Sequence, residues 1–250
     1  MKSEDNCKKT DTNIDKIKKT LEDMIDMELV VFAEEYDMYI HPFTSSKRVV
    51  VENNGKYSKL DLTLQENFFI WKKHLVKQFA GIKQIDEVFD YIETNYFTLF
   101  ILSQFYKKGI ISSEDMGEML KNKFRYLFDK EPYLVNRNDV VDIFKYADKI
   151  SLMDKESLTY YQNLPANITL YRAIENKGYD QPFVWFQSQQ EAISNQIFHD
   201  YNQMVEIWQL DVPRENILAV WLDEHQGNII IVDVNEKLNR NIICKQIESK

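Results

Sequence analysis

The spacing of apolar residues changes about two thirds of the way along the chain. Before residue 164 they recur mainly at intervals of three and four, which is typical of amphipathic helices. After it, short runs rich in β-branched and aromatic residues predominate, and such runs are typical of strands. We therefore predict an α+β fold, with a helical N-terminal region packed on a mainly antiparallel sheet.

Helical spacing in the N-terminal region is interrupted by one hairpin signal. Asn54-Gly55 suits a tight turn and follows a β-branched run, so residues 49–57 are predicted to form a β-hairpin. Thr63 and Glu66 form a capping-box pattern at a helix start, and Ser112 begins another helix that opens with acidic residues. The predicted helices cover residues 14–29, 63–79, 86–108, 112–128 and 138–150.

The C-terminal region reads as strands with a single helix among them. Ser188 and Glu191 form a second capping-box pattern, which predicts a helix to about Tyr201. Because helices do not alternate regularly with the strands, an antiparallel sheet is favoured over a parallel one. The predicted strands cover residues 168–172, 183–186, 205–212, 217–222 and 229–234, with a sixth candidate at 242–244.

These patterns suggest three parts. Residues 1–12 are expected to be a disordered tail, residues 13–160 a mostly helical region with one hairpin, and residues 161–250 the strand-rich domain. With only 6 glycines and 5 prolines, no flexible linker is evident, so the two larger parts are expected to pack together.

Charge excludes some classes of partner. The 31 basic and 40 acidic side chains give a net charge of −9, which disfavours general binding to nucleic acid or to an anionic membrane. Residues 22–37 contain seven acids and no base, so they form either a solvated helix face or a contact surface for a basic partner.

Cysteine and histidine content argues against a disulfide framework and a metal site. The two cysteines, Cys7 and Cys244, lie near opposite ends, and the four histidines are scattered. No apolar run approaches the length of a membrane span, and the N-terminus lacks the apolar stretch of a secretion signal. A cytoplasmic location and no direct membrane binding are therefore expected.

General catalytic motifs are absent, including phosphate-binding glycine loops and nucleophile elbows. The order of residues between Leu170 and Asp233 nevertheless resembles the ADP-ribosyltransferase fold of the Arg-Ser-Glu class, in particular its short prophage-type members. The segments that carry the resemblance are Leu-Tyr-Arg-Ala at 170–173, Trp185 with Ala192 seven residues later, Leu-Asp-Val-Pro at 210–213, Ile-Leu-Ala at 217–219, and the turn at 224–228 before the run 229–232.

The resemblance implies NAD as the cofactor and assigns three residues to its binding. Arg172, beside Tyr171, stands where the family arginine contacts phosphate or ribose, a task suited to a planar guanidinium. Trp185 stands at the tryptophan of the family's Ser-Trp-Thr strand, where Val184 and Phe186 replace the two hydroxyl residues.

The resemblance assigns catalysis to the turn before the run 229–232. Gln226 and Asn228 stand at the family's Glu-x-Glu positions, whose last glutamate stabilises the positive charge that develops as nicotinamide leaves. A neutral Asn228 removes that charge, a loss on the order of 3–4 kcal/mol. Glu224 or Asp223 supplies a displaced carboxylate if the loop folds back.

Each of these residues also has a structural interpretation. Arg172 is alternatively a surface arginine of a strand, Trp185 a core residue, and Gln226-Gly227-Asn228 a tight hairpin turn. The functional hypotheses are correspondingly an NAD-dependent mono-ADP-ribosyltransferase of bacterial or phage origin, acting on a host protein or nucleotide, and a catalytically degenerate member that acts as an acidic protein-binding inhibitor or regulator. A third hypothesis is an acidic mimic of nucleic acid.

Overall fold

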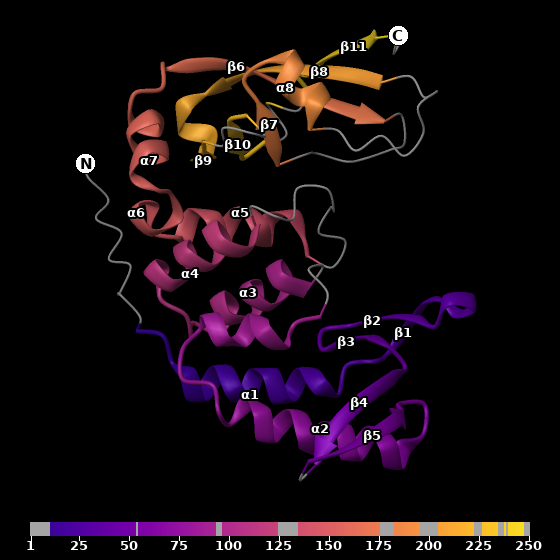
Figure 1. Cartoon of the computed structure of the whole chain (residues 1–250). Coiled ribbons are helices and arrows are strands. Elements are labelled where there is room, and N and C mark those ends of the chain that lie inside the picture. The colour runs from indigo at the N-terminus through magenta and orange to yellow at the C-terminus, as the bar shows by residue number, and fades with distance from the viewer. Residues whose placement is uncertain are drawn as a thin grey trace. The chain divides into compact units, whose positions relative to one another are not determined.

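The structure is a computed structural model that describes residues 11–53, 55–93, 97–124, 135–175, 183–195, 205–222, 227–234, 238 and 240–247. Its contacts group the chain into two compact units. The N-terminal unit comprises Met1–Asp115 and Pro132–Val140, and the C-terminal unit comprises Met116–Glu131 and Val141–Lys250. Helices and antiparallel sheets occur together, so the α+β class is confirmed (Figure 1).

The N-terminal unit combines helices with two small sheets, a three-stranded sheet of order β1-β2-β3 and the hairpin β4-β5. Two helices, α4 (Ser113–Met119) and α5 (Arg137–Tyr146), extend across the division between the units. The other elements of this unit are α1 (Ile14–Ile25), β1 (Val30–Ala33), η1 (Glu34–Tyr36), β2 (Met38–His41), β3 (Thr44–Ser46), β4 (Arg48–Asn53), β5 (Lys56–Asp61), α2 (Gln65–Phe79), η2 (Asp86–Tyr91) and α3 (Thr98–Lys107).

Helix α1 begins where helical spacing predicts it, but it ends at Ile25 instead of continuing to residue 29. The Asn13 side chain accepts a hydrogen bond from the backbone N–H of Lys16 and so caps the helix. Ile17, Leu21 and Ile25 are fully buried, and α1 packs along α2 (Figure 1). The hairpin predicted at 49–57 is also confirmed, because β4 and β5 pair in an antiparallel register.

The helical region differs from the prediction in several places. The strands β1 to β3 are not among the predicted elements. The helix predicted over 86–108 is instead the short 3-10 helix η2 followed by α3, because Ile92 ends η2 in an extended conformation. The helix predicted over 138–150 breaks after Tyr146, and Asp148 caps a new short helix, α6 (Lys149–Leu152).

The C-terminal unit contains a six-stranded sheet of order β11-β8-β6-β7-β10-β9, with every neighbouring pair antiparallel. The predicted strands are therefore confirmed, including the sixth. The elements of this unit are the π-helix η4 (Leu120–Phe124), α6, α7 (Lys155–Gln162), β6 (Asn167–Glu175), β7 (Val184–Phe186), α8 (Gln189–Ser194), β8 (Val205–Pro213), η5 (Arg214–Asn216), β9 (Ile217–Trp221), β10 (Ile229–Val232) and β11 (Ile243–Ile247).

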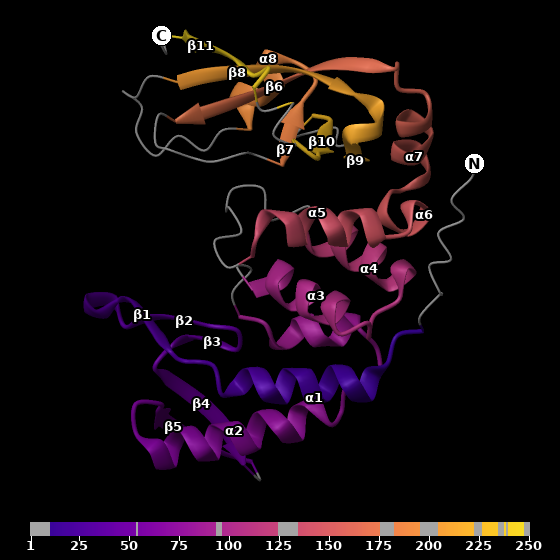
Figure 2. The same ribbon diagram turned by 180° about the vertical axis from the view of Figure 1, so that it is seen from behind.

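Helices attach to both halves of this sheet. Helix α8 contacts β6 and β7, and α7 contacts β9, as both views show (Figures 1 and 2). The Trp221 indole N–H donates to the Leu152 carbonyl at 2.8 Å, and the Leu222 N–H donates to the Ser157 hydroxyl at 3.0 Å. These bonds link the end of β9 to α6 and α7. None of the helices described is long and apolar enough to cross a membrane.

Candidate functional site

Arg172 lies on β6, Trp185 lies on β7 and Asn228 directly precedes β10, and these three strands are neighbours in the order β6-β7-β10. Phe186 of β7 lies opposite Tyr171 on one side and Ile229 on the other. When both antiparallel registers are continued, Arg172 lies opposite Trp185, and Asn228 lies opposite Gln187. Because side chains alternate along a strand, the positions of Arg172, Gln187 and Asn228 share one face of the sheet.

Arg172 is half-buried and is held against β7. Its Nη1 donates a hydrogen bond to the carbonyl of Val184 at 2.9 Å. This hydrogen bond holds the guanidinium beside β7. Tyr171, the next residue of β6, is also half-buried and occupies the opposite face of the sheet.

Trp185 is enclosed by protein, with 0% of its surface exposed. Its neighbours in β7, Val184 and Phe186, are buried as well. This position matches the core interpretation that the sequence left open for Trp185, and it leaves the indole without a surface to offer a ligand.

Asn228 belongs to a polar cluster of Tyr160, Gln187, Ser188, Glu191 and Asn228. The Asn228 Nδ2 donates to Gln187 Oε1 at 2.8 Å, and Gln187 Nε2 is hydrogen-bonded to the Tyr160 hydroxyl. Burial raises the pKa of Tyr160 above its usual value, and the bond to Gln187 partly opposes that rise. The phenol therefore stays neutral, and the cluster links α7, β7 and the turn before β10.

Glu191 places a carboxylate against Asn228. Its Oε2 accepts hydrogen bonds from the Ser188 N–H at 2.9 Å and from the Ser188 hydroxyl at 3.0 Å. The predicted capping box is thereby confirmed. The other oxygen, Oε1, accepts the backbone N–H of Asn228 at 3.3 Å. The Glu191 carboxylate thus lies beside Asn228, the neutral residue at the position where the resemblance implies a glutamate.

Gly227 permits the close approach between the turn before β10 and the Glu191 carboxylate. Its φ is +79°, a left-handed conformation that favours glycine. A Cβ at this position would come within 2.8 Å of Glu191 Oε1. A larger residue would therefore require either the turn or the Glu191 side chain to shift.

Two of the predicted catalytic residues, Gln226 and Glu224, lie outside the described residues, as does Asp223. Glu191 and Gln187 are absent from the predicted site. The capping-box pattern identifies Glu191 only as part of a helix start. Nothing local in the sequence indicates its contact with a residue 37 positions away.

Neither metal chemistry nor a known relative identifies the site. Within the part of the chain that the structure describes, no group of three or more His, Cys, Asp or Glu side chains is placed to hold a metal ion. Comparisons with protein-family models, with curated proteins and with solved structures found no match.

Proposed function

We propose that the C-terminal unit is an ADP-ribosyltransferase-like module that binds NAD and directs its ADP-ribose to a macromolecular target, a host protein or nucleotide. The observation that carries the proposal is the adjacency of β6, β7 and β10, the strands with which the three motif segments are associated. Arg172 lies on β6, Asn228 lies directly before β10, and their positions share a sheet face, as one bound dinucleotide requires.

In this proposal each polar side chain has a defined task. Arg172 contacts the pyrophosphate, since a guanidinium forms strong charge-assisted hydrogen bonds with phosphate oxygens. Asn228 contacts a ribose hydroxyl, with Gln187 orienting its amide through the 2.8 Å bond. Trp185 takes no part in binding, because it is fully enclosed.

The charge of Glu191 bears on whether turnover occurs. In the reaction the bond between ribose C1′ and the nicotinamide nitrogen breaks, nicotinamide leaves with the electron pair, and positive charge develops on the ribose. A nucleophilic atom of the target then forms the new bond to C1′ and releases its proton to solvent. A neutral Asn228 offsets none of that charge, which costs roughly a hundred- to thousand-fold in rate. Glu191, whose carboxylate contacts the Asn228 backbone, is the described residue best placed to restore part of it.

A second candidate is a catalytically degenerate protein of the same fold that acts as an acidic protein-binding inhibitor or regulator. Two observations favour it. The Asn228 amide is already hydrogen-bonded within the protein, and both oxygens of Glu191 accept bonds from the chain itself. In this case the polar cluster stabilises the turn before β10 and has no ligand.

Titration calorimetry with NAD and with ADP-ribose separates the two candidates. The wild type should bind both, and Arg172→Gln should weaken binding at least about tenfold through loss of the charge-assisted contact. Arg214→Gln is the matched control, because Arg214 lies in the same unit and also donates to a backbone carbonyl, that of Leu164 at 3.2 Å. It should bind as the wild type does.

Absence of NAD and ADP-ribose binding to the wild type would contradict the first candidate. A second measurement tests transfer itself, by incubating the protein with labelled NAD and a cell lysate and following the label. Label on a macromolecule supports a transferase, whereas absence of both nucleotide binding and transferred label supports the regulator.

A further inference from the structure

The three-stranded sheet of the N-terminal unit ends in a strand with an open edge. The order is β1-β2-β3, and among the described strands β1 pairs with β2 alone. Val30 and Val31 are 50% and 52% exposed, although they point to opposite faces of the strand. Such exposure of adjacent valines on opposite faces is unusual, because valine is among the residue types most often buried.

Other edges near this sheet carry positive side chains that discourage pairing with another chain. The hairpin β4-β5 contains Arg48, Lys56 and Lys59, and Lys47 directly follows β3. Lysines on an edge strand are a common protection against unwanted strand addition. Residues 28–36, which contain β1, have no lysine, arginine, proline or glycine.

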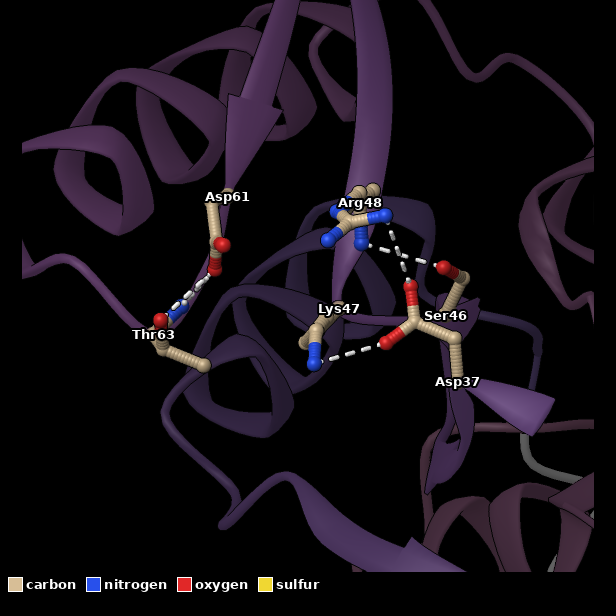
Figure 3. A network of polar contacts seen from close by, with 6 residues as sticks. All are labelled: Asp37, Ser46, Lys47, Arg48, Asp61 and Thr63. Atoms are coloured by element: carbon tan, nitrogen blue, oxygen red, sulfur yellow. Dashed lines mark hydrogen bonds and ion pairs between the residues drawn. The ribbon is translucent and has the colours of Figure 1, made fainter. Parts of the chain in front are cut away.

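Negative charge surrounds this edge. Glu28, Glu34 and Glu35 are exposed, and within the described chain no ion pair reaches any of them. Asp37 is different, because its carboxylate pairs with Lys47 at 2.8 Å and with Arg48 at 3.7 Å (Figure 3). The neighbouring bases are therefore engaged with Asp37, and the charge beside β1 is not neutralised.

The same ion pairs hold the ribbon that presents β1. Asp37 adopts a left-handed conformation with φ of 58° at the turn between η1 and β2, and its bonds to Lys47 and Arg48 connect that turn to the start of β4. In both views the η1 end of the β1-β2 ribbon points away from α1 (Figures 1 and 2). The edge is thus presented on an ordered support.

We propose that β1 is a docking edge for a partner protein, which adds an extended segment rich in basic and β-branched residues as a further strand. Backbone hydrogen bonds along the edge would supply affinity, and Glu28, Glu34 and Glu35 would select basic side chains. This interaction is independent of the nucleotide site in the other unit.

Charge argues against a second copy of this chain as the occupant. Antiparallel pairing of β1 with its own copy would set Glu28 of one chain beside Glu34 or Glu35 of the other, depending on register. Like charges facing each other across strands are destabilising. A basic segment would instead place positive side chains beside Glu28, Glu34 and Glu35, which is favourable.

The test uses the full-length protein and a fluorescein-labelled peptide of alternating lysine and valine, followed by fluorescence anisotropy. The wild type should bind the peptide, and Val31→Lys should weaken binding at least about tenfold. Val50→Lys is the matched control, because Val50 lies on β4, is 61% exposed and gains the same charge. It should bind as the wild type does.

A second probe separates strand addition from simple charge attraction. The same peptide with methyl groups on alternate backbone nitrogens keeps its charge but loses donors for strand pairing. Equal binding of both peptides, or no binding of either, would overturn the proposal. A concentration-dependent dimer in light scattering that Val31→Lys abolishes would also overturn it, in favour of a second copy.

Discussion

At the scale of single residues, the candidate site turns on how charge is placed around Asn228. The side chain at this position is neutral, yet the carboxylate of Glu191 contacts its backbone N–H at 3.3 Å. A carboxylate carried by another element can act on a developing charge only if it reaches the reacting atom. The pair of residues therefore offers a direct comparison between a charge at position 228 and one at position 191.

On the proposed function, Asn228→Glu should raise the rate of NAD hydrolysis, measured as released nicotinamide, because it puts a negative charge beside the cation that would develop on the ribose. Asn228→Gln is the neutral control and should not raise it. Glu191→Gln, which keeps an oxygen for the capping box, should lower any wild-type rate about tenfold or more if Glu191 supplies the charge. Identical rates in Asn228→Glu and Asn228→Gln would contradict this account.

His41 makes the stability of the N-terminal unit depend on pH. Its Nδ1 accepts the Phe43 N–H at 3.2 Å, so Nε2 carries the proton and donates to the Ile25 carbonyl. Burial lowers the pKa of His41 from 6.5 to about 4, and the bond to Ile25 partly opposes that shift. Between these values the unfolded chain binds the proton more readily, so the stabilisation present above pH 6.5 decreases as the pH falls towards 4.

The expected loss is roughly 3 kcal/mol of unfolding free energy between pH 6.5 and 4, measured by urea denaturation. His41→Gln removes the titrating group and should flatten this dependence, although it lowers stability at neutral pH. His74 provides the control, because it lies on the half-exposed side of α2, and His74→Gln should leave the slope unchanged. Equal slopes for the wild type and His41→Gln would contradict the assignment.

At the scale of elements, the two capping-box patterns show what local sequence can predict. Ser188 and Glu191 form both bonds of the box at the start of α8. Thr63 and Glu66 have the same spacing, yet α2 begins after Leu64 without a side-chain cap. The Asp61 carboxylate accepts hydrogen bonds from the Thr63 N–H at 3.0 Å and from the Thr63 hydroxyl at 2.6 Å (Figure 3). This local turn competes with the capping box for the Thr63 side chain.

Strands of the six-stranded sheet were more predictable than helix boundaries for a related reason, although β1 to β3 were not predicted. Runs such as Ile229–Val232 are buried throughout, so composition alone marks them. Helix ends depend on single caps, such as Asp154, whose carboxylate accepts the Ser157 N–H and begins α7, a helix absent from the predicted elements. The contact between Glu191 and Asn228 lay beyond prediction, because it depends on the fold rather than on neighbouring residues.

Gly117 tests how closely two helices approach. A Cβ on this residue of α4 would lie 2.8 Å from the Asp148 carbonyl and 2.9 Å from the Leu152 nitrogen, both backbone atoms of the α6 region. Gly117→Ala should therefore destabilise the protein by about 1–3 kcal/mol, against the gain of up to about 1 kcal/mol that alanine gives in an open helix. Glu118→Ala, on the exposed side of α4, measures propensity alone and should change stability little.

Thermal and urea unfolding of the two variants provide the comparison. A stabilised Gly117→Ala protein would mean that α4 and α6 lie further apart than these distances indicate. The outcome also bears on the C-terminal unit as a whole, because α6 in turn contacts α7, the helix that packs on β9.

At the scale of the whole molecule, the sequence predicted a boundary at residue 160, whereas the compact units divide on either side of residues 116–131 and after Val140. Polar contacts explain why helices before residue 160 belong with the sheet. Lys149 Nζ is hydrogen-bonded to the Leu218 carbonyl, and Lys145 pairs with Asp233 at 2.8 Å. Burial lowers the pKa of Lys149 to about 8, and the bond to the Leu218 carbonyl ties the end of this side chain to β9.

These contacts predict the course of limited proteolysis. Cleavage near residue 160 would separate β9 from the Leu152 carbonyl and the Ser157 hydroxyl, so no stable fragment should begin there.

Trp221→Phe keeps a ring in the core but removes the N–H that Leu152 accepts, which leaves a buried carbonyl unsatisfied at a cost of about 1–3 kcal/mol. This variant should be cleaved faster than the wild type between residues 153 and 165, as mass spectrometry of the digest will show. Trp208→Phe is the control, since its indole N–H donates instead to Glu206 at 3.3 Å, and it should be cleaved there at the wild-type rate. A stable fragment that begins near residue 160 would show that the sheet folds without α6 and α7, and that the boundary predicted from the sequence is the one that governs folding.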